Sequence, residues 1–236
     1  MATSPFLSRL AEGPLLCDGA MGTMLYARGV PLDGCFDVLN ANNPTLVQSI
    51  HAAYLSAGAD LIETNTFGAN RFKLALHGLD ARVREINARG AKLARDVRET
   101  MGREAFVLGS IGPLGKYLAP IGTIGVEEGR AAFREQADGL LEGGVDAFIV
   151  ETFSDLGEIR LAVEAIRALT DELPIIAQMA FTEEGVTFVG RSAVEVARAL
   201  RGLPVQVIGA NCSVGSSVLY DILEQMLPEA GGLPIS

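Results

Sequence analysis

The chain has 236 residues, of which 49% are hydrophobic and 20% are charged, a balance typical of one globular domain spanning residues 1–236. Its formal net charge of −10 argues against nucleic acid and anionic membrane surfaces as partners, because both would repel an acidic protein. The sequence has no long apolar run, no signal-peptide pattern and only three scattered cysteines, so we expect a cytoplasmic protein with reduced thiols that binds small molecules.

Strands and helices are expected to alternate along the chain. A short helix over residues 3–12 should plug one end of the fold, and a first strand at 15–18 leads into a glycine-rich turn at 19–23. Asn43 and Pro44 are typical of a helix start, which predicts a helix over 44–57 ended by Gly58. Helical periodicity continues over 71–101, with a break at Gly78. Further strands are predicted at 60–65, 105–110, 145–150, 174–180 and 205–211, and further helices at 126–142, 155–170 and 192–202.

Two of these helices begin with the spacing of a capping box, in which an N-cap side chain and a residue three positions later bond each other's backbone amides. Asp155 with Glu158 predicts one such box, and Ser192 with Glu195 predicts the other. Both glutamates are therefore expected to stabilise the start of their own helix.

The repeated strand and helix units predict a parallel sheet covered by helices. A doubly wound sheet and a (β/α)8 barrel both contain such units. The turn after the first strand reads Gly19-Ala20-Met21-Gly22 and lacks the G-x-G-x-x-G of a dinucleotide site, so we favour a TIM-type barrel. About six βα units are present, and residues 231–236 predict the start of a seventh strand. We therefore expect the chain to be the amino-terminal part of a longer protein.

Polar side chains stand at the carboxyl ends of the predicted strands, where the binding groups of barrels collect. Buried carboxylates persist only when they are paired, which points to recognition of an ammonium group. The backbone N–H groups of the turn at 19–22 are suited to hold a carboxylate, so the two features together describe an amino-acid site. The candidate residues are Asp18, Gly19, Ala20, Met21, Glu63, Asn65, Ser110 and Glu151.

Cys212 follows the strand at 205–211 and is a candidate nucleophile or metal ligand, although a free cysteine is often only a small buried residue. His51 and His77 both lie in helical stretches, which argues against a Cys-His nucleophile pair. A metal thiolate fits better, but zinc takes three or four protein ligands and Cys212 supplies one. Cys17 should face the helices if Asp18 faces the mouth of the barrel, because successive strand residues point to opposite sides.

Five motifs carry a resemblance to a known family. They are Asp18-Gly19-Ala20-Met21-Gly22-Thr23, the run 63–70 (ETNTFGAN), the run 109–113 (GSIGP), Glu151-Thr152-Phe153 and Gly209-Ala210-Asn211-Cys212. In this order, and spanning residues 14–215, they resemble the homocysteine S-methyltransferase domain. The resemblance is greatest to the amino-terminal modules of cobalamin-dependent methionine synthase and of bifunctional homocysteine methyltransferase/methylenetetrahydrofolate reductase, and the segments 34–40 and 175–179 favour the second.

The resemblance implies a (β/α)8 barrel that binds zinc through three cysteines, the first of which is Cys212. The other two, an adjacent pair, are expected beyond Ser236. It further implies that Glu151 and Asp18 hold the ammonium of homocysteine, that the amides of Ala20 and Met21 hold its carboxylate, and that no residue is catalytic beyond the zinc-bound thiolate mechanism. The metal-bound thiolate would attack a methyl donor, which in this family is methylcobalamin, methyltetrahydrofolate through cobalamin, or S-methylmethionine, free or on a donor-carrying domain. With one zinc ligand of three, residues 1–236 alone are expected to bind zinc poorly and to be inactive.

Two other functions remain open from the residues. A barrel lyase acting on a small acid would bind a divalent metal through Asp18, Glu63 and Glu151, would depend on magnesium and would not be affected by Cys212→Ala. A non-catalytic module that docks to folate or cobalamin domains would lack the cysteine pair in the complete chain.

Overall fold

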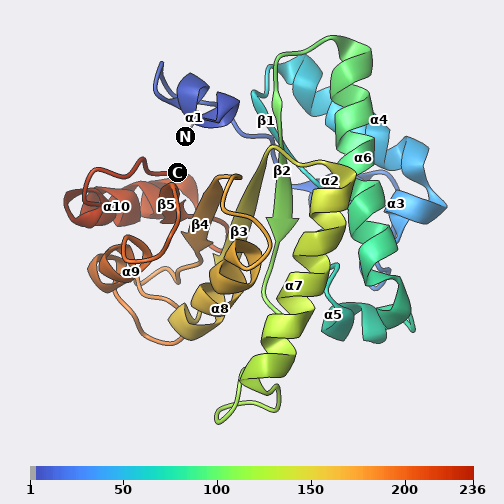
Figure 1. Ribbon diagram of the computed structural model, residues 1–236. Coiled ribbons are helices and arrows are strands. Elements are labelled where there is room, and N and C mark those ends of the chain that lie inside the picture. The colour runs from blue at the N-terminus through green and yellow to red at the C-terminus, as the bar shows by residue number, and fades with distance from the viewer. Residues whose placement is uncertain (1–3) are drawn as a thin grey trace.

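The computed structural model describes residues 4–236 and contains five parallel strands that alternate with helices (Figure 1). The strands are β1 (Leu61–Glu63), β2 (Phe106–Ile111), β3 (Ala147–Phe153), β4 (Ile175–Met179) and β5 (Val207–Ala210). The helices are α1 (Pro5–Leu10), α2 (Met21–Ala27), α3 (Leu39–Asn42), α4 (Pro44–Ala57), α5 (Arg71–Ala75), α6 (Val83–Met101), α7 (Val126–Gly143), α8 (Leu156–Arg167), α9 (Ala193–Leu200) and α10 (Ser216–Met226), with 3₁₀ turns η1 (Asp80–Arg82) and η2 (Leu227–Glu229). Among the residues described, no helix has the length and apolarity needed to cross a bilayer.

The strand order in the sheet is β1-β2-β3-β4-β5, and every neighbouring pair is parallel. A doubly wound sheet reverses its strand order at a switch point, whereas a barrel adds each new strand beside the preceding one. The predicted first strand is reduced to a parallel bridge between Cys17 and Leu61. The predicted seventh strand is present as a parallel bridge between Ile208 and Ile235. This consecutive order is that of a barrel wall and excludes the doubly wound alternative.

Helix boundaries follow local sequence signals at several predicted positions. The Asn43 side chain accepts a hydrogen bond from the amide of Leu46 and caps α4, which ends at Gly58 in the left-handed conformation. The break expected near Gly78 separates α5 from α6, and Gly102 ends α6 with a φ of 61°. The capping box of Ser192 and Glu195 at α9 is present with both of its bonds. Helices α2 and α3 were not predicted.

The capping box predicted for α8 is wrong in one of its two bonds. The Asp155 side chain accepts from the amide of Glu158 at 2.8 Å, as expected. The Glu158 carboxylate does not return to its own helix and instead accepts from the amide of Leu114 at 2.8 Å. Helix α8 also ends at Arg167, three residues earlier than predicted.

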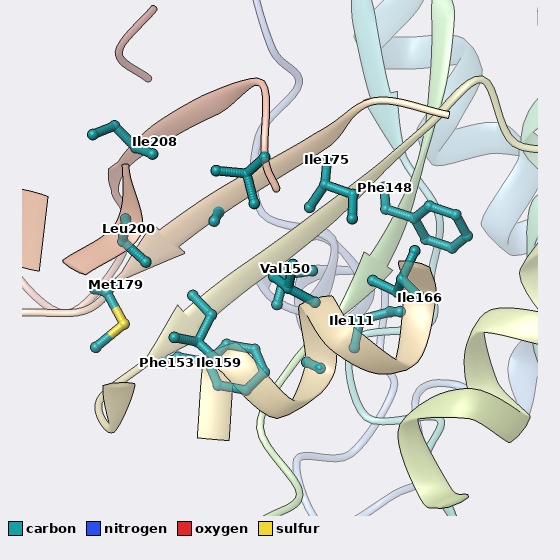
Figure 2. Close-up of a cluster of buried hydrophobic side chains, with 14 of the residues drawn as sticks. Ile111, Phe148, Val150, Phe153, Ile159, Ile166, Ile175, Met179, Leu200 and Ile208 are labelled. Atoms are coloured by element: carbon teal, nitrogen blue, oxygen red, sulfur yellow. The ribbon is translucent and has the colours of Figure 1, made fainter. Parts of the chain in front are cut away.

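Two apolar layers lie on the two faces of the sheet. The larger layer packs strand residues against helices, and Figure 2 shows Phe148, Val150 and Ile175 of the sheet near Ile159 and Ile166 of α8. Fully burying such side chains contributes about 1.5 to 3 kcal/mol each, so this layer is the main source of stability. The smaller layer, on the inner face, contains Leu61, Leu108, Ala147, Ile149, Ile176 and Val207.

The short first helix closes the inner layer at the amino-terminal ends of the strands. Phe6 of α1 is buried in this layer and packs edge to face on Phe106, with ring centroids 5.6 Å apart. In Figure 1, α1 lies at the end of the sheet opposite to the strand arrowheads. The expectation that this helix plugs one end of the fold is therefore confirmed for residues 5–10, and residue 3 of the predicted range lies outside the described residues. The carboxyl ends of the strands, at the opposite end of the sheet, are not covered by this helix.

Candidate functional site

A cavity of about 710 Å³ opens at the carboxyl ends of the strands. This volume is in the range of small-molecule sites. All nine residues singled out in the sequence line it: Asp18, Gly19, Ala20, Met21, Glu63, Asn65, Ser110, Glu151 and Cys212. They come from four of the strand ends and from the turn before α2, so the barrel geometry brings together groups that are far apart in the sequence.

Three carboxyl groups gather at the inner end of this cavity. Asp18 accepts a hydrogen bond from the amide of Glu63 at 3.0 Å, and Glu151 is only 7% exposed. Among residues 4–236, no lysine, arginine or histidine lies within 4.0 Å of a carboxylate oxygen of Asp18, Glu63 or Glu151, whereas fourteen ion pairs form elsewhere. Among the described residues, the three carboxyl groups therefore have no ion-pair partner to stabilise them when they ionise.

The crowding of these acids changes their protonation. Burial raises the pKa of Asp18 to about 7, even though the amide of Glu63 opposes the shift. Burial, followed by the charges of Glu151 and Asp18, raises the pKa of Glu63 well above its usual range. Near neutral pH the cluster therefore retains bound protons, and a cation entering the cavity would favour their release.

A hydrogen-bond network fixes the Glu151 carboxylate. Ser110 is 1% exposed, and its hydroxyl donates to one oxygen of Glu151 at 2.6 Å. The second oxygen of Glu151 accepts two hydrogen bonds. One comes from the side-chain nitrogen of Asn211 at 2.9 Å, and the other comes from the Thr152 hydroxyl at 3.3 Å. Three side chains from β2, β3 and the end of β5 therefore orient one acid toward the cavity.

Cys212 is exposed to this cavity and has a left-handed backbone with a φ of 56°. The amide nitrogen of Asn211 lies 3.6 Å from its sulfur. Burial raises the pKa of the Cys212 thiol, a hydrogen bond with Thr152 lowers it, and the charges of Glu151 and Glu63 raise it further. The protein alone thus holds Cys212 as a thiol, and a bound cation is needed to favour the thiolate.

Cys17 corrects a prediction, because it does not face the helices. Its sulfur lies 3.4 Å from an oxygen of Glu63 and 3.6 Å from an oxygen of Asp18, and the residue packs with the inner apolar layer. The alternation of side chains fails here because the first strand is a single bridge, after which Asp18 turns over the strand end to meet the amide of Glu63. Burial and the charges of Glu63 and Asp18 raise the pKa of Cys17 far above its ordinary value, so it remains a thiol donor.

Asn65 lines the cavity, but its amide nitrogen is engaged with the protein. It donates to the carbonyl of Phe36 at 2.8 Å and to the side chain of Asn40 at 3.1 Å. The two N–H groups therefore hold the loop before α3, through Phe36, and α3 itself, through Asn40. Of the two polar side-chain atoms of Asn65, only the oxygen is left for the substrate contact that the sequence predicted.

Tyr54 supports the turn at Gly19 and was missed in the sequence. Its hydroxyl donates to the carbonyl of Ala20 at 3.1 Å. A Cβ atom on Gly19 would lie 2.8 Å from the same hydroxyl oxygen, so the close approach requires glycine. Tyr54 lies in the last turn of α4, where no local pattern distinguishes it from a packing residue.

Comparison with known proteins decides the family. The sequence pattern that defines the family described as homocysteine S-methyltransferase matches residues 15–235. The chain belongs to the homocysteine S-methyltransferase family. It is 35% identical over 243 aligned residues to the methionine synthases of Mycobacterium tuberculosis and Mycobacterium leprae. The alignment covers 98% of this chain and 20% of each relative, so the chain spans about one fifth of the length of these curated relatives.

Solved structures of the same family confirm the barrel-type fold. The metallated form of the homocysteine methyltransferase MmuM from Escherichia coli superposes with a TM-score of 0.83 at 26% identity, covering 98% of this chain and 85% of that one. Its oxidised form gives a TM-score of 0.80 at 27% identity, covering 97% and 84%. A 2,3-dimethylmalate lyase is 17% identical with a TM-score of 0.50, which shows a similar fold and no more.

Proposed function

We propose that this homocysteine S-methyltransferase domain binds homocysteine in the cavity and presents its thiol at Cys212 for methylation to methionine. The observation that carries the proposal is the acidic cluster of Asp18, Glu63 and Glu151, which lines the cavity and has no cationic side chain within 4.0 Å among residues 4–236. A buried charge persists only when it is paired, and the α-ammonium of an amino acid supplies such a partner. Membership in the family and the likeness to a homocysteine methyltransferase support the choice of amino acid.

The proposed orientation of homocysteine uses both ends of the site. Asp18 and Glu151 hold the ammonium, and the backbone amides of Ala20 and Met21, at the start of α2, hold the carboxylate. Glu63 is the third carboxyl group of the acidic cluster. The thiol then extends toward Cys212, which lines the same cavity. Ser110 acts on the substrate through the oxygen of Glu151 that it orients.

Zinc is part of this proposal, with Cys212 as the one ligand that this chain contributes. When bound, zinc ionises a coordinated thiol and so supplies the nucleophile. Cys212 fits this role because its sulfur is exposed to the cavity and its thiolate is disfavoured without a cation. Cys17 does not fit, because its thiol is committed to Glu63 and Asp18. Cys17, Asp18 and Glu63 have possible ligand atoms within 4.8 Å of one another, but this group does not include Cys212. The remaining ligands of a zinc ion on Cys212 are therefore proposed to lie outside residues 4–236.

The methyl donor would reach the thiol through the outer part of the cavity. Methylcobalamin, methyltetrahydrofolate through cobalamin, and S-methylmethionine all remain candidate donors, free or on a donor-carrying domain. We therefore propose that this chain binds and orients homocysteine, and that the methyl donor approaches from the side of the cavity away from the acidic cluster.

The test compares ligands that differ in one group. Homocysteine and 4-mercaptobutyrate share a thiol and a carboxylate, but only homocysteine has an ammonium. We expect calorimetric titration to show binding of homocysteine about 100-fold tighter, since leaving buried carboxylates unpaired costs about 2 to 5 kcal/mol. Glu151→Gln should reduce this ratio, and Glu164→Gln on the outer surface of α8 should not. Equal affinities for both ligands in the unmodified protein would exclude the ammonium site.

The metal is tested separately by its content in zinc-loaded protein. In a protein that also contains the remaining zinc ligands, Cys212→Ala should lower the zinc retained after dialysis, measured by mass spectrometry, while Cys35→Ala serves as a matched cysteine control. Magnesium dependence that survives Cys212→Ala would instead favour the lyase.

A further inference from the structure

One wall of the homocysteine cavity is the loop that follows β2. Leu114, Gly115 and Lys116 of this loop line the cavity, and Leu114 is fully buried. Two side chains fix the loop from outside. Asn70 donates to the carbonyl of Pro113 at 3.2 Å, and Glu158 accepts from the amide of Leu114 at 2.8 Å.

The contact of Glu158 is unusual for a residue in the first turn of a helix. Glu158 occupies the position of α8 that Glu195 occupies in α9, where Glu195 folds back on its own N-cap Ser192. The N-cap side chain accepts from the amide of the glutamate in both helices, so the two differ only in the partner of the glutamate carboxylate. Its carboxylate, in a residue that is 7% exposed, instead reaches a loop 44 positions earlier in the chain.

We propose that Glu158 is a positioning residue for the substrate site, which acts by holding the wall at Leu114 in the arrangement that binds homocysteine. Glu158 does not line that cavity, so it would act through the loop and not by touching substrate. A hydrogen bond to a charged acceptor is stronger than one between neutral groups, which is enough to select one loop conformation over others. The inference rests on the proposed function, because it names what positions the same site.

The charge of Glu158 gives this role a signature. Three groups face its carboxylate: the amide of Leu114, the carboxylate of Asp155 on its own helix and the ammonium of Lys73 from α5. Burial, with a smaller contribution from the charge of Asp155, raises the pKa of Glu158 to about 7 against the opposing effects of Leu114 and Lys73. The ionised carboxylate is a stronger acceptor than the neutral acid. The wall is therefore held more firmly at pH 8 than at pH 6.

The experiment measures how strongly the Leu114 amide is protected against hydrogen exchange. Exchange is followed by NMR between pH 6 and 8 and corrected for intrinsic exchange rates. We expect Glu158→Ala to lower the protection of this amide about tenfold, as loss of one net hydrogen bond implies. Glu158→Gln keeps an acceptor without a charge, so it should retain part of the protection and lose the pH dependence. Glu195→Ala is the matched control at α9 and should change neither quantity.

Binding of homocysteine at the same two pH values completes the test. Glu158→Ala should weaken binding several-fold, with partial rescue in Glu158→Gln, and the pH dependence contributed by Asp18 should remain in all variants. Loss of protection without any loss of affinity would overturn the positioning role. Unchanged protection of the Leu114 amide in Glu158→Ala would also overturn it. If Glu158→Ala does not fold, the same conclusion follows when the protection in Glu158→Gln depends on pH as strongly as in the unmodified protein. Absence of homocysteine binding in the unmodified protein would refute the proposed function. The hydrogen-exchange result would then test only the hydrogen bond between Glu158 and the amide of Leu114.

Discussion

Replacing Asp18 by asparagine is expected to stabilise the protein and to impair binding of homocysteine. Burial raises the pKa of Asp18 from 3.8 to about 7, which means that folding disfavours the ionised carboxylate. Each pKa unit corresponds to about 1.36 kcal/mol, so the full penalty is about 4 kcal/mol, reduced to about 2 to 4 kcal/mol by water in the cavity. Asparagine is neutral and retains an oxygen that can accept from the amide of Glu63.

The sign of the pH dependence follows from proton counts. Between pH 3.8 and 7 the folded protein holds a proton on Asp18 that the unfolded chain has lost, so the free energy of unfolding falls as pH rises through this range. The asparagine variant does not lose stability in this range, because position 18 then has no carboxyl group that ionises. Its advantage should be absent near pH 3, grow toward pH 7 and remain constant above it.

Thermal unfolding at a series of pH values measures this difference directly. At pH 8 we expect the variant to melt roughly 5 to 15 °C above the unmodified protein. Calorimetry should show that it binds homocysteine at least tenfold more weakly, because a carboxylate that would pair with the ammonium is gone. A variant that is no more stable at pH 8 than at pH 4, relative to the unmodified protein, would refute the view that Asp18 is held in a strained charged state for binding.

Two further predictions concern the network around Glu151. Asn211→Ala removes donors to Glu151 and Thr152, and we expect it to lower the free energy of unfolding by about 2 to 4 kcal/mol and to weaken homocysteine binding, as measured by urea denaturation and calorimetry. Asn43→Ala is its control, because loss of the α4 N-cap should cost about 1 kcal/mol with no effect on affinity. Ser110→Ala leaves one oxygen of Glu151 without its donor and should cost about 1 to 3 kcal/mol of stability, and an unchanged unfolding midpoint would contradict the assigned bond.

The positions of the strand ends could be predicted because they follow from patterns that are local in sequence. Buried runs of β-branched residues predicted the strands, Gly58 ended α4 where expected, and α6 ended at Met101 as its periodicity predicted. Once the strands are parallel and in consecutive order, their polar ends must meet at one rim. That is why every predicted site residue lines the same cavity.

The contacts of side chains across the rim could not be predicted in the same way. The sequence around Glu158 satisfies the capping-box pattern, yet a buried amide in a distant loop is the partner in the structure. The orientation of Cys17 depended on a strand that proved to be a single bridge, so the rule of alternation did not apply. In both cases a tertiary contact replaced the local partner that the pattern implied.

The dipeptide Glu151-Thr152 near the end of β3 and the dipeptide Asn211-Cys212 directly after β5 form one unit, although they are 60 positions apart. Thr152 and Cys212 both have left-handed backbones, with φ of 62° and 56°, an arrangement that costs about 1 to 3 kcal/mol for each non-glycine residue. Asn211 stabilises it: its side-chain oxygen accepts from the amide of Thr152 at 2.9 Å, and its nitrogen donates to the Thr152 hydroxyl at 3.0 Å. Strain of this kind persists only where surrounding contacts compensate for it, and here it turns an acid and a thiol from separate strands toward the same cavity.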